Sequence, residues 1–129
     1  MIFGVGIDTI EVERIERSIL QYGDQFVSRI FSAEEIRYCS RKPHKYEHFA
    51  ARFAAKEAFA KALGTGIRRG FVWKSVSVAH EFTGRPFIRL LDTMPARAEA
   101  ILGKDFRILL SLTHTKSLAE ATAIIEVER

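Results

Sequence analysis

An alanine-rich segment, residues 46–63, constrains the fold of this chain more than any other feature. Alanine is the best helix former and the smallest side chain that still favours a helix. Gly64 follows the segment at the place where a glycine caps the C-terminus of a helix. We therefore expect one long helix over residues 46–63, against which neighbouring backbones pack closely. Its alanines are Ala50, Ala51, Ala54, Ala55, Ala58, Ala60 and Ala62.

Two glycines, Gly4 and Gly6, lie in a short apolar segment that ends at Asp8. Glycine inside a strand marks a place where another backbone or a ligand approaches closely. We therefore expect residues 2–8 to form a buried strand with such a neighbour. Asp8 either caps the helix that follows or belongs to a functional site.

Three shorter helices are expected before the long one. Apolar residues recur at helical spacing over residues 12–19, which predicts an amphipathic helix that ends near Gly23. A second short helix begins at residue 24 or 25. Ser32 and Glu35 have capping-box spacing and predict a third helix that ends near Cys39.

The second half of the chain shows strand periodicity. Val72, Val76 and Val78 recur with a period of two, which predicts a strand over about residues 72–78. Together with the helices, these elements predict a single α+β domain over residues 1–129, with a mainly antiparallel sheet packed against the long helix. The other expected elements are a turn at residues 83–85, a returning strand over 86–91, a helix between Thr93 and Gly103, and strands over 106–113 and 121–127.

Composition limits the classes of function. A formal charge of +4 and a pI near 9.5 fit an acidic partner, but they do not choose between nucleic acid, an acidic protein and a phosphorylated small molecule. No apolar run approaches the roughly 18 residues of a membrane span, so we expect no membrane partner. The single cysteine, Cys39, excludes an internal disulfide and fits a cytoplasmic location, and we expect no signal peptide.

Asp8 and Glu57 are the candidate metal ligands. Glu57 shares one face of the long helix with Phe53 and Lys61, and a carboxylate on a partly buried face must be paired, hydrogen-bonded or metal-bound. Two carboxylates from different elements suit Mg²⁺, which keeps several waters and completes its shell with substrate phosphates. The alternative is a simple Glu57–Lys61 ion pair along the helix.

Basic residues near these carboxylates indicate phosphate binding. The cluster at residues 41–45 is a candidate grip for phosphate. Lys56, Lys61 and the loop that begins at Gly64 add positive charge and exposed backbone, although the loop lacks Walker A spacing. His114 ends a strand, where a polar side chain is more often plain surface.

Taken together, these residues resemble the bacterial holo-[acyl-carrier-protein] synthase family of 4′-phosphopantetheinyl transferases over essentially the whole chain. The most specific block is residues 52–66. Arg85 stands where lysine is common, and Leu112-Thr113 vary the usual residues, but neither departure touches the proposed metal ligands. The other matching pieces are Gly6-Ile7-Asp8, Arg14-Ile15, residues 31–39, Gly84-Arg85-Pro86 and Ser111-Leu112-Thr113-His114.

The resemblance implies transfer of 4′-phosphopantetheine from coenzyme A to a serine of apo acyl carrier protein, with adenosine 3′,5′-bisphosphate as the other product, in support of fatty acid biosynthesis. It implies that Asp8 and Glu57 hold Mg²⁺ and that Lys61, also catalytic, neutralises a phosphate oxygen. Such chemistry needs charge neutralisation and in-line positioning more than covalent catalysis. A metal-bound water or a carboxylate such as Glu57 accepts the serine proton. The expected coenzyme A contacts are Arg52, Lys56, Lys61, Gly64, His114, Lys42 and Lys45.

The resemblance also implies a homotrimer with active sites at subunit interfaces. Carrier proteins are strongly acidic, so the expected docking surface is basic. It consists of Arg14 and Arg17 on the first helix, with Phe26 and Arg29 beyond it.

Two other classes compete with this interpretation. A small basic nucleic-acid-binding module would use residues 41–45 and 68–69 on phosphates and Trp73 for stacking. It leaves Asp8 and Glu57 unexplained, because carboxylates repel a polyanion. A non-catalytic subunit with the same fold is the other alternative, and the intact candidate ligands argue against it.

Overall fold

A computed structural model describes residues 1–68 and 70–128 of the chain. The elements follow one another as β1 (Ile2–Glu11), α1 (Val12–Tyr22), α2 (Asp24–Ile30), α3 (Ala33–Ser40), α4 (Lys45–Leu63), a 3₁₀ turn η1 (Trp73–Ser75), β2 (Val76–His80), β3 (Pro86–Leu90), α5 (Met94–Leu102), β4 (Phe106–His114) and β5 (Leu118–Val127). Among the described residues, no helix has both the length and the apolarity that a bilayer span requires.

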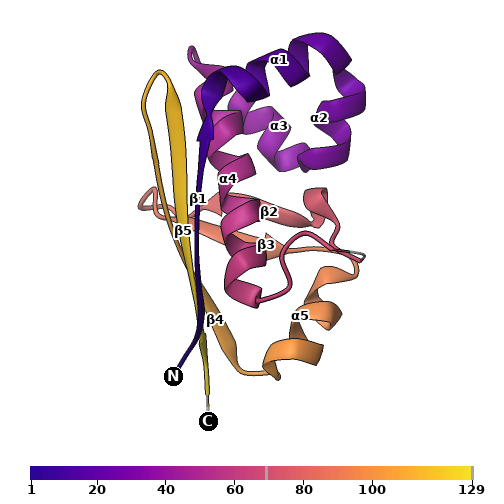
Figure 1. The fold of residues 1–129 in the computed structure, drawn as a ribbon, viewed down its shortest axis with the longest axis vertical. Coiled ribbons are helices and arrows are strands. Elements are labelled where there is room, and N and C mark those ends of the chain that lie inside the picture. The colour runs from indigo at the N-terminus through magenta and orange to yellow at the C-terminus, as the bar shows by residue number, and fades with distance from the viewer. Residues whose placement is uncertain (69, 129) are drawn as a thin grey trace.

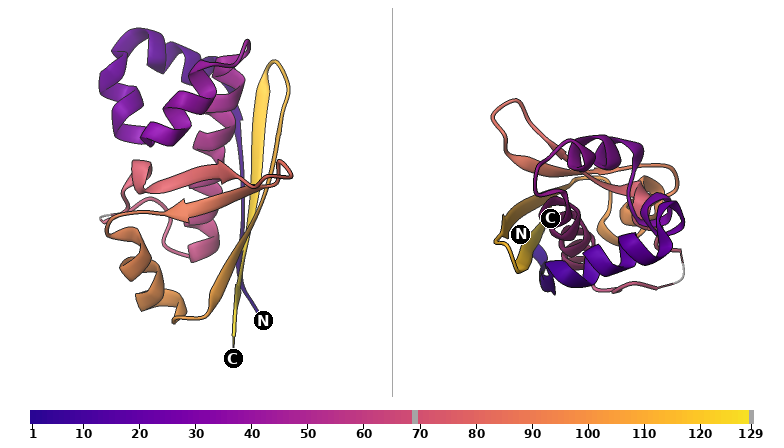
Figure 2. Two further views of the ribbon diagram at one scale, coloured as in Figure 1. Left: turned by 180° about the vertical axis from the view of Figure 1, so that it is seen from behind. Right: turned by 90° about the horizontal axis from the view of Figure 1, so that it is seen from above.

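A three-stranded antiparallel sheet forms one layer, and α4 packs along it (Figure 1). Its strand order is β1-β5-β4, so both termini lie at the same end of this sheet. β2 and β3 form a separate antiparallel pair. Helices α1 to α3 gather at the end away from the termini, and α5 lies toward the other end (Figure 2). The predicted α+β class, with antiparallel sheet against the long helix, is confirmed.

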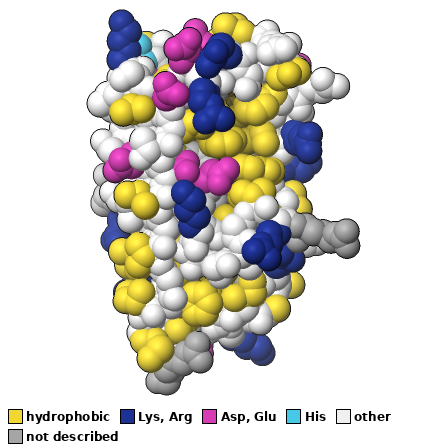
Figure 3. All heavy atoms as spheres, viewed as in Figure 1, with side chains coloured by type: hydrophobic (Ala, Val, Ile, Leu, Met, Phe, Trp, Pro, Cys, Tyr) yellow, Lys and Arg dark blue, Asp and Glu magenta, His cyan; other side chains and the backbone are white. Residues whose placement is uncertain are grey.

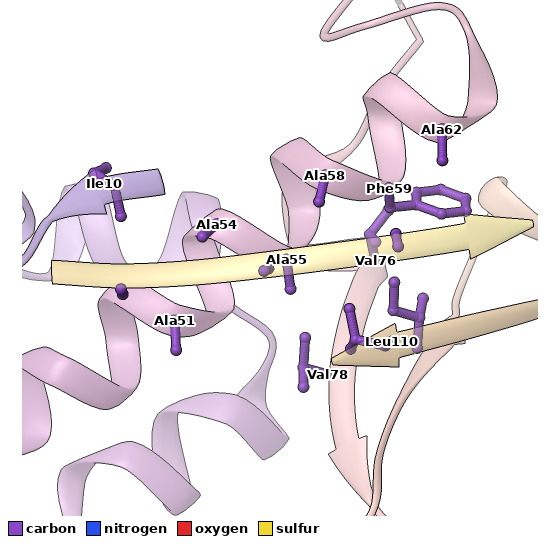
Figure 4. Close-up of a cluster of buried hydrophobic side chains, with 14 of the residues drawn as sticks. Ile10, Ala51, Ala54, Ala55, Ala58, Phe59, Ala62, Val76, Val78 and Leu110 are labelled. Atoms are coloured by element: carbon purple, nitrogen blue, oxygen red, sulfur yellow. The ribbon is translucent and has the colours of Figure 1, made fainter. Parts of the chain in front are cut away.

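β1 and α4 lie so close that only glycine fits at two positions of the strand. A Cβ atom at Gly4 would lie 1.9 Å from the carbonyl oxygen of Ala62, and one at Gly6 would lie 1.9 Å from that of Ala58. The predicted close approach of a backbone to the first strand is therefore confirmed. The strand is not buried as predicted, because the side chains of Ile2, Val5 and Ile7 point away from α4 and are more than half exposed. Figure 4 shows the small side chains of α4, together with Phe59, beside the strand residues Val76, Val78 and Leu110.

The helix ends follow their sequence signals. Ser32 and Glu35 form a reciprocal capping box, in which each side chain accepts a hydrogen bond from the backbone N–H of the other. Gly64 ends α4 in the left-handed region with φ of 90°, which glycine adopts without strain. Gly23 separates α1 from α2.

The sequence prediction was wrong for residues 72–75. Instead of starting a strand, Trp73–Ser75 form a 3₁₀ turn, and β2 begins only at Val76. The ammonium group of Lys56 donates to the carbonyl oxygens of both Trp73 and Val76. A buried lysine that binds these two carbonyls holds the turn shape, and a strand period cannot reveal that contact.

The first strand is longer than predicted. β1 continues to Glu11 because it pairs with β5 along its whole length, and β5 correspondingly begins at Leu118 rather than at residue 121. Asp8 therefore lies inside β1, opposite Ala121, and the N-cap position of α1 belongs to Glu11. The helix-capping alternative for Asp8 is wrong.

Candidate functional site

Asp8 and Lys61 meet between β1 and α4. The Lys61 ammonium lies 3.2 Å from Oδ1 of Asp8 and donates to the carbonyl oxygen of Ile7 at 2.8 Å. Gly6 makes this meeting possible, because its missing side chain lets α4 approach the strand. Asp8 is half-buried, whereas half of the Lys61 side chain is exposed. The lysine is therefore placed to exchange its carboxylate partner for a ligand from solvent.

Glu57 belongs to the same site. It is half-buried on α4, one turn before Lys61. Burial raises the pKa of the Glu57 carboxyl, the neighbouring Asp8 carboxylate raises it further, and Lys61 opposes both. Within the described residues the ion pair of Lys61 is with Asp8, and none joins it to Glu57. The helical ion pair considered as the alternative is therefore not formed.

We call Asp8, Glu57 and Lys61 the carboxylate site, and its two carboxylates are oxygen ligands of the kind that a magnesium ion takes. The two carboxylates come from separate elements, and the charge of Asp8 destabilises the charged form of Glu57. In the described part of the chain, no group of three or more histidine, cysteine or acidic side chains gathers to hold a metal. A site with two protein carboxylates leaves positions for water and phosphate oxygens, which is the arrangement that Mg²⁺ favours.

A second site lies on the other side of α4. A cavity of about 190 Å³ lies between α3, α4, the β2–β3 hairpin and β4. Three of its lining residues are histidines, and the guanidinium of Arg52 lies over the Tyr38 ring, 4.3 Å from its centroid. We call this the histidine cavity. Its lining is Tyr38, His48, Arg52, His80, Gly84, Pro86, Leu112 and His114.

Two histidines of the histidine cavity have lowered pKa values. Burial, followed by the charge of Arg52, lowers the pKa of His48 to about 4. The same two causes, in the same order, lower the pKa of His80. His114 lies at the rim, where its Nδ1 is 2.9 Å from a carboxylate oxygen of Glu47. Two neutral histidines therefore stand beside a permanent cation.

The expected phosphate-binding residues divide between these two sites. Arg52 and His114 line the histidine cavity. The Lys42 ammonium lies over the Tyr38 ring, 4.6 Å from its centroid, and Tyr38 lines the same cavity. Gly64 follows Lys61 at the end of α4 and is exposed. Lys45 lies apart from both sites, in a shallow cavity with Glu16, Tyr46 and Lys116.

Lys56 contradicts its expected role. Its side chain is fully buried, and its ammonium already binds a carboxylate oxygen of Glu35 at 2.8 Å and the carbonyl oxygens of Trp73 and Val76. Burial lowers the pKa of Lys56, and the charge of Glu35 opposes that shift. A side chain with no exposed surface and three acceptors cannot contact coenzyme A, so Lys56 is a structural residue. The sequence did not pair it with Glu35, which lies 21 residues away.

The residues expected to dock the carrier protein lie on α1 and α2. Arg14 and Arg17 are exposed, since Val12 and Ile15 occupy the buried side of α1. Phe26 and Arg29 line an apolar groove of about 560 Å³, together with Tyr22, Gln25, Ile30 and Trp73. The described surface thus combines exposed arginines with a groove beside them.

Figure 3 shows the face on which α4 and β1 lie in front. Acidic and basic side chains stand next to one another in its middle, and a broad hydrophobic area lies above them on the side of helices α1 to α3.

The aromatic surface proposed for nucleic acid is not free. Trp73 stacks on Phe53 with ring centroids 4.9 Å apart and meets Phe71 edge-on. Of the basic pair, Arg68 is exposed, and Arg69 lies outside the described residues.

Sequence reasoning missed Tyr38, His48 and His80. They come from three different elements, and no spacing in the sequence links them. The only signal was indirect, since three of the four histidines of the chain line the histidine cavity. Their convergence is a tertiary property.

Known proteins match this chain over nearly its whole length. The family model described as the 4′-phosphopantetheinyl transferase superfamily matches residues 4–116. Holo-[acyl-carrier-protein] synthases from Solibacter usitatus and Koribacter versatilis are 50% and 46% identical to it, over 98% of this chain and 99% of each relative.

Solved structures agree with these matches. A holo-[acyl-carrier-protein] synthase from Neisseria meningitidis has a TM-score of 0.88 at 32% identity and covers 98% of this chain and 99% of its own. The synthase from Bacillus anthracis, solved in complex with CoA (3′,5′-ADP), has a TM-score of 0.79 at 32% identity and covers 99% of both chains. The chain therefore belongs to the 4′-phosphopantetheinyl transferase superfamily, within the family of holo-[acyl-carrier-protein] synthases.

Proposed function

We propose that this chain transfers the 4′-phosphopantetheine group of coenzyme A to a serine hydroxyl of an apo acyl carrier protein, with Mg²⁺ as the cofactor. The products are holo carrier protein and adenosine 3′,5′-bisphosphate, and the reaction supplies carrier protein for fatty acid synthesis. The observation that carries the proposal is the meeting of Asp8, Glu57 and Lys61 at one accessible site between β1 and α4.

The residues of the carboxylate site have complementary roles in this reaction. Asp8 and Glu57 would hold Mg²⁺. The bound metal would neutralise negative charge on the diphosphate of coenzyme A. Lys61, whose side chain is half exposed, donates to a phosphate oxygen as a compact point charge. A carboxylate of the site or a water beside it accepts the proton that the serine hydroxyl loses. In-line positioning and charge neutralisation supply most of the rate enhancement.

The coenzyme A contacts lie on two sides of α4. Arg52 and Lys61 are nine residues apart, which at 3.6 residues per turn is two and a half turns and places them on roughly opposite sides of the helix. Arg52 faces Tyr38 and His80, whereas Lys61 faces β1. One ligand that uses both clusters fits best where two subunits meet. We assign Arg52, His114 and Lys42 to one subunit's share of the ligand, and Lys61 and Gly64 to the neighbour's.

The outer face of the three-stranded sheet supports a homotrimer. Val5, Ile124 and Leu109 lie in register across β1, β5 and β4. Val5 points away from α4, since its neighbours Gly4 and Gly6 face the helix, and it is 59% exposed. A contiguous apolar patch on a sheet face marks an interface. Copies of the same chain would bury it.

The arginine-bearing surface of α1 and α2 is the proposed docking site for the acidic carrier protein. Arg14, Arg17 and Arg29 are exposed, and Phe26 lies in the groove beside Arg29. Charges of this kind steer association and make it depend on salt.

Two further residues have a place in the proposal. Lys45, which lies apart from both sites, is proposed as an additional contact of coenzyme A. The buried thiol of Cys39 suits the expected cytoplasmic location.

The direct test is mass spectrometry of an apo acyl carrier protein incubated with coenzyme A, Mg²⁺ and the enzyme. We expect a mass gain equal to one phosphopantetheine group, which disappears without enzyme or after chelation of the metal. A carrier protein that keeps its mass under all conditions would refute the proposed function. Salt-dependent binding to random DNA, without transfer, would instead favour the nucleic-acid alternative.

Shared sites can be tested by mixing two inactive variants. A Glu57→Ala variant lacks a ligand of the carboxylate site, and a His114→Ala variant lacks a group of the histidine cavity. Suppose that each active site takes its carboxylate site from one subunit and its histidine cavity from the neighbour. Random exchange of subunits in an equal mixture then gives intact sites at about a quarter of the interfaces. Activity of the mixture that stays at the level of the separate variants would argue for sites contained within single subunits.

A further inference from the structure

Three imidazole rings surround the histidine cavity, and the proposed function uses only one of them. His114 is among the expected coenzyme A contacts, but His48 and His80 have no assigned role. Both are half-buried and face the cavity that Arg52 also lines. Both rings would therefore lie beside an anionic ligand that entered the cavity.

The hydrogen bonding of His80 fixes its charge in the free protein. Nη2 of Arg52 lies 3.4 Å from Nε2 of His80. A guanidinium only donates hydrogen bonds, so Nε2 must be the acceptor and the ring is neutral, with its proton on Nδ1. The Tyr38 ring stacks on His80 at 4.9 Å and holds the plane of the imidazole. Protonation of Nε2 would set two donors and two positive charges against each other.

His48 is held neutral by its surroundings. Its ring meets Tyr38 and His114 edge-on, with centroids 5.8 and 4.8 Å apart. Arg52, His114 and Lys42 disfavour its charged form, and Glu47 favours it. His80 has the same cationic neighbours, Arg52 and Lys42, and Glu34 as the opposing acid.

The cavity itself has positive charge without a matching anion. Arg52 is only 2% exposed, and its buried Nε has no hydrogen-bond partner. The Lys42 ammonium lies over the same Tyr38 ring that Arg52 contacts. No carboxylate belongs to the described lining, and Glu47, which lies beside it, already binds His114. Two cations, an unsatisfied donor and two neutral imidazoles are the complement of a phosphate monoester.

We propose that His48 and His80 contact a phosphate monoester of the donor and become protonated when that phosphate binds. This inference rests on the proposed function, because coenzyme A is the phosphate-bearing ligand. A monoester brings a charge of about −1.5 to −2, which offsets the cations that now keep both rings neutral. Each ring takes its proton from solvent and then donates a hydrogen bond to a phosphate oxygen. No covalent bond forms or breaks.

The sign of the pH dependence follows from this uptake. A ligand that takes up protons on binding binds more tightly as pH falls, with about a tenfold change in Kd per pH unit for each proton. The trend should hold from about pH 8 to pH 6, since below that range the monoester itself protonates with a pKa near 6. A site built only from lysine and arginine shows no such uptake.

The test is calorimetric titration of the trimeric or native enzyme with adenosine 3′,5′-bisphosphate at pH 7.5. This probe keeps the 3′-phosphate monoester of coenzyme A, has a second monoester at the 5′ position in place of the diphosphate, and lacks the pantetheine arm. Titrations in buffers with different ionisation enthalpies give the number of protons taken up. We expect net uptake by wild type, less in His48→Phe and in His80→Asn, and none in the double variant. His44→Asn is the matched control, because His44 is exposed and outside the cavity.

A second measurement reports the rings themselves. The ¹⁵N resonances of His48 and His80 should show neutral imidazoles in the free protein at pH 7 and imidazolium on saturation with the probe. Binding without proton uptake, uptake that persists in the double variant, or no binding at all would overturn the inference. Proton-linked binding without phosphopantetheine transfer would refute only the proposed function.

Discussion

Replacing Lys56 with methionine tests the importance of the buried ion pair between α3 and α4. Its ammonium binds Glu35 at 2.8 Å and the carbonyls of Trp73 and Val76, and both charged side chains are fully buried. Removing one partner of a buried pair typically costs about 3–5 kcal/mol, because the other charge stays buried. Glu35 keeps hydrogen bonds from the backbone N–H groups of Ser32 and Val78, so we expect the lower end, about 3 kcal/mol.

The assay is urea unfolding at one fixed protein concentration, because an oligomer's stability depends on concentration. With an m-value of about 1–3 kcal/mol/M, a loss of about 3 kcal/mol lowers the midpoint by about 1–3 M. Trp73 is the only tryptophan, so quenching of its fluorescence by acrylamide reports the turn that Lys56 holds. We expect greater quenching in the folded variant.

Lys61→Met is the matched control on the same helix. Its ion pair with Asp8 is partly exposed, and pairs of that kind contribute about 1 kcal/mol or less. We expect Lys61→Met to lose transfer activity with little loss of stability. Equal midpoints for the two variants would refute the reasoning that the Lys56 pair is structural and the Lys61 pair functional.

Six other variants test the remaining claims. Asp8→Ala and Glu57→Ala should each abolish transfer with an unchanged circular dichroism spectrum, and near-normal turnover in either would remove that residue from the metal site. Lys61→Arg should recover only part of the activity lost in Lys61→Ala, because a planar guanidinium does not replace a compact ammonium; full recovery in steady-state kinetics would contradict this. Arg14→Glu should raise KM for the carrier protein at low salt and leave KM for coenzyme A unchanged, and the opposite pattern would place docking elsewhere. Gly6→Ala should unfold or strongly destabilise the protein in thermal melts, because its Cβ would meet the Ala58 carbonyl oxygen at 1.9 Å, and a wild-type melting temperature would contradict the packing of β1 on α4.

Local sequence patterns predicted most of the secondary structure, because their causes are local. The alanines of α4, its Gly64 cap and the capping box at Ser32 act within a few residues of the element they define. The two glycines of β1 also predicted a close neighbour, since a residue without a side chain leaves room for another backbone to approach. The strand ends were wrong where pairing with β5, rather than periodicity, set them.

The candidate site was predicted only as a set of residue types. The sequence by itself determined that Asp8, Glu57 and Lys61 were available and that Glu57 and Lys61 share a helix face. It did not determine that Lys61 pairs with Asp8, 53 residues away, instead of with Glu57. That choice depends on how closely β1 approaches α4, which is a property of packing.

Lys56 and Lys61 show the same limit most clearly. Both are lysines of one motif, yet one is fully buried against Glu35 and the other is half exposed beside Asp8. The helix period places them on different faces, but it does not say which of these faces packs against α3 and β2 and is buried there. The histidine cavity, likewise, assembles residues from five elements. Such convergence is decided by tertiary structure, because the free energy of burial depends on neighbours that are distant in sequence.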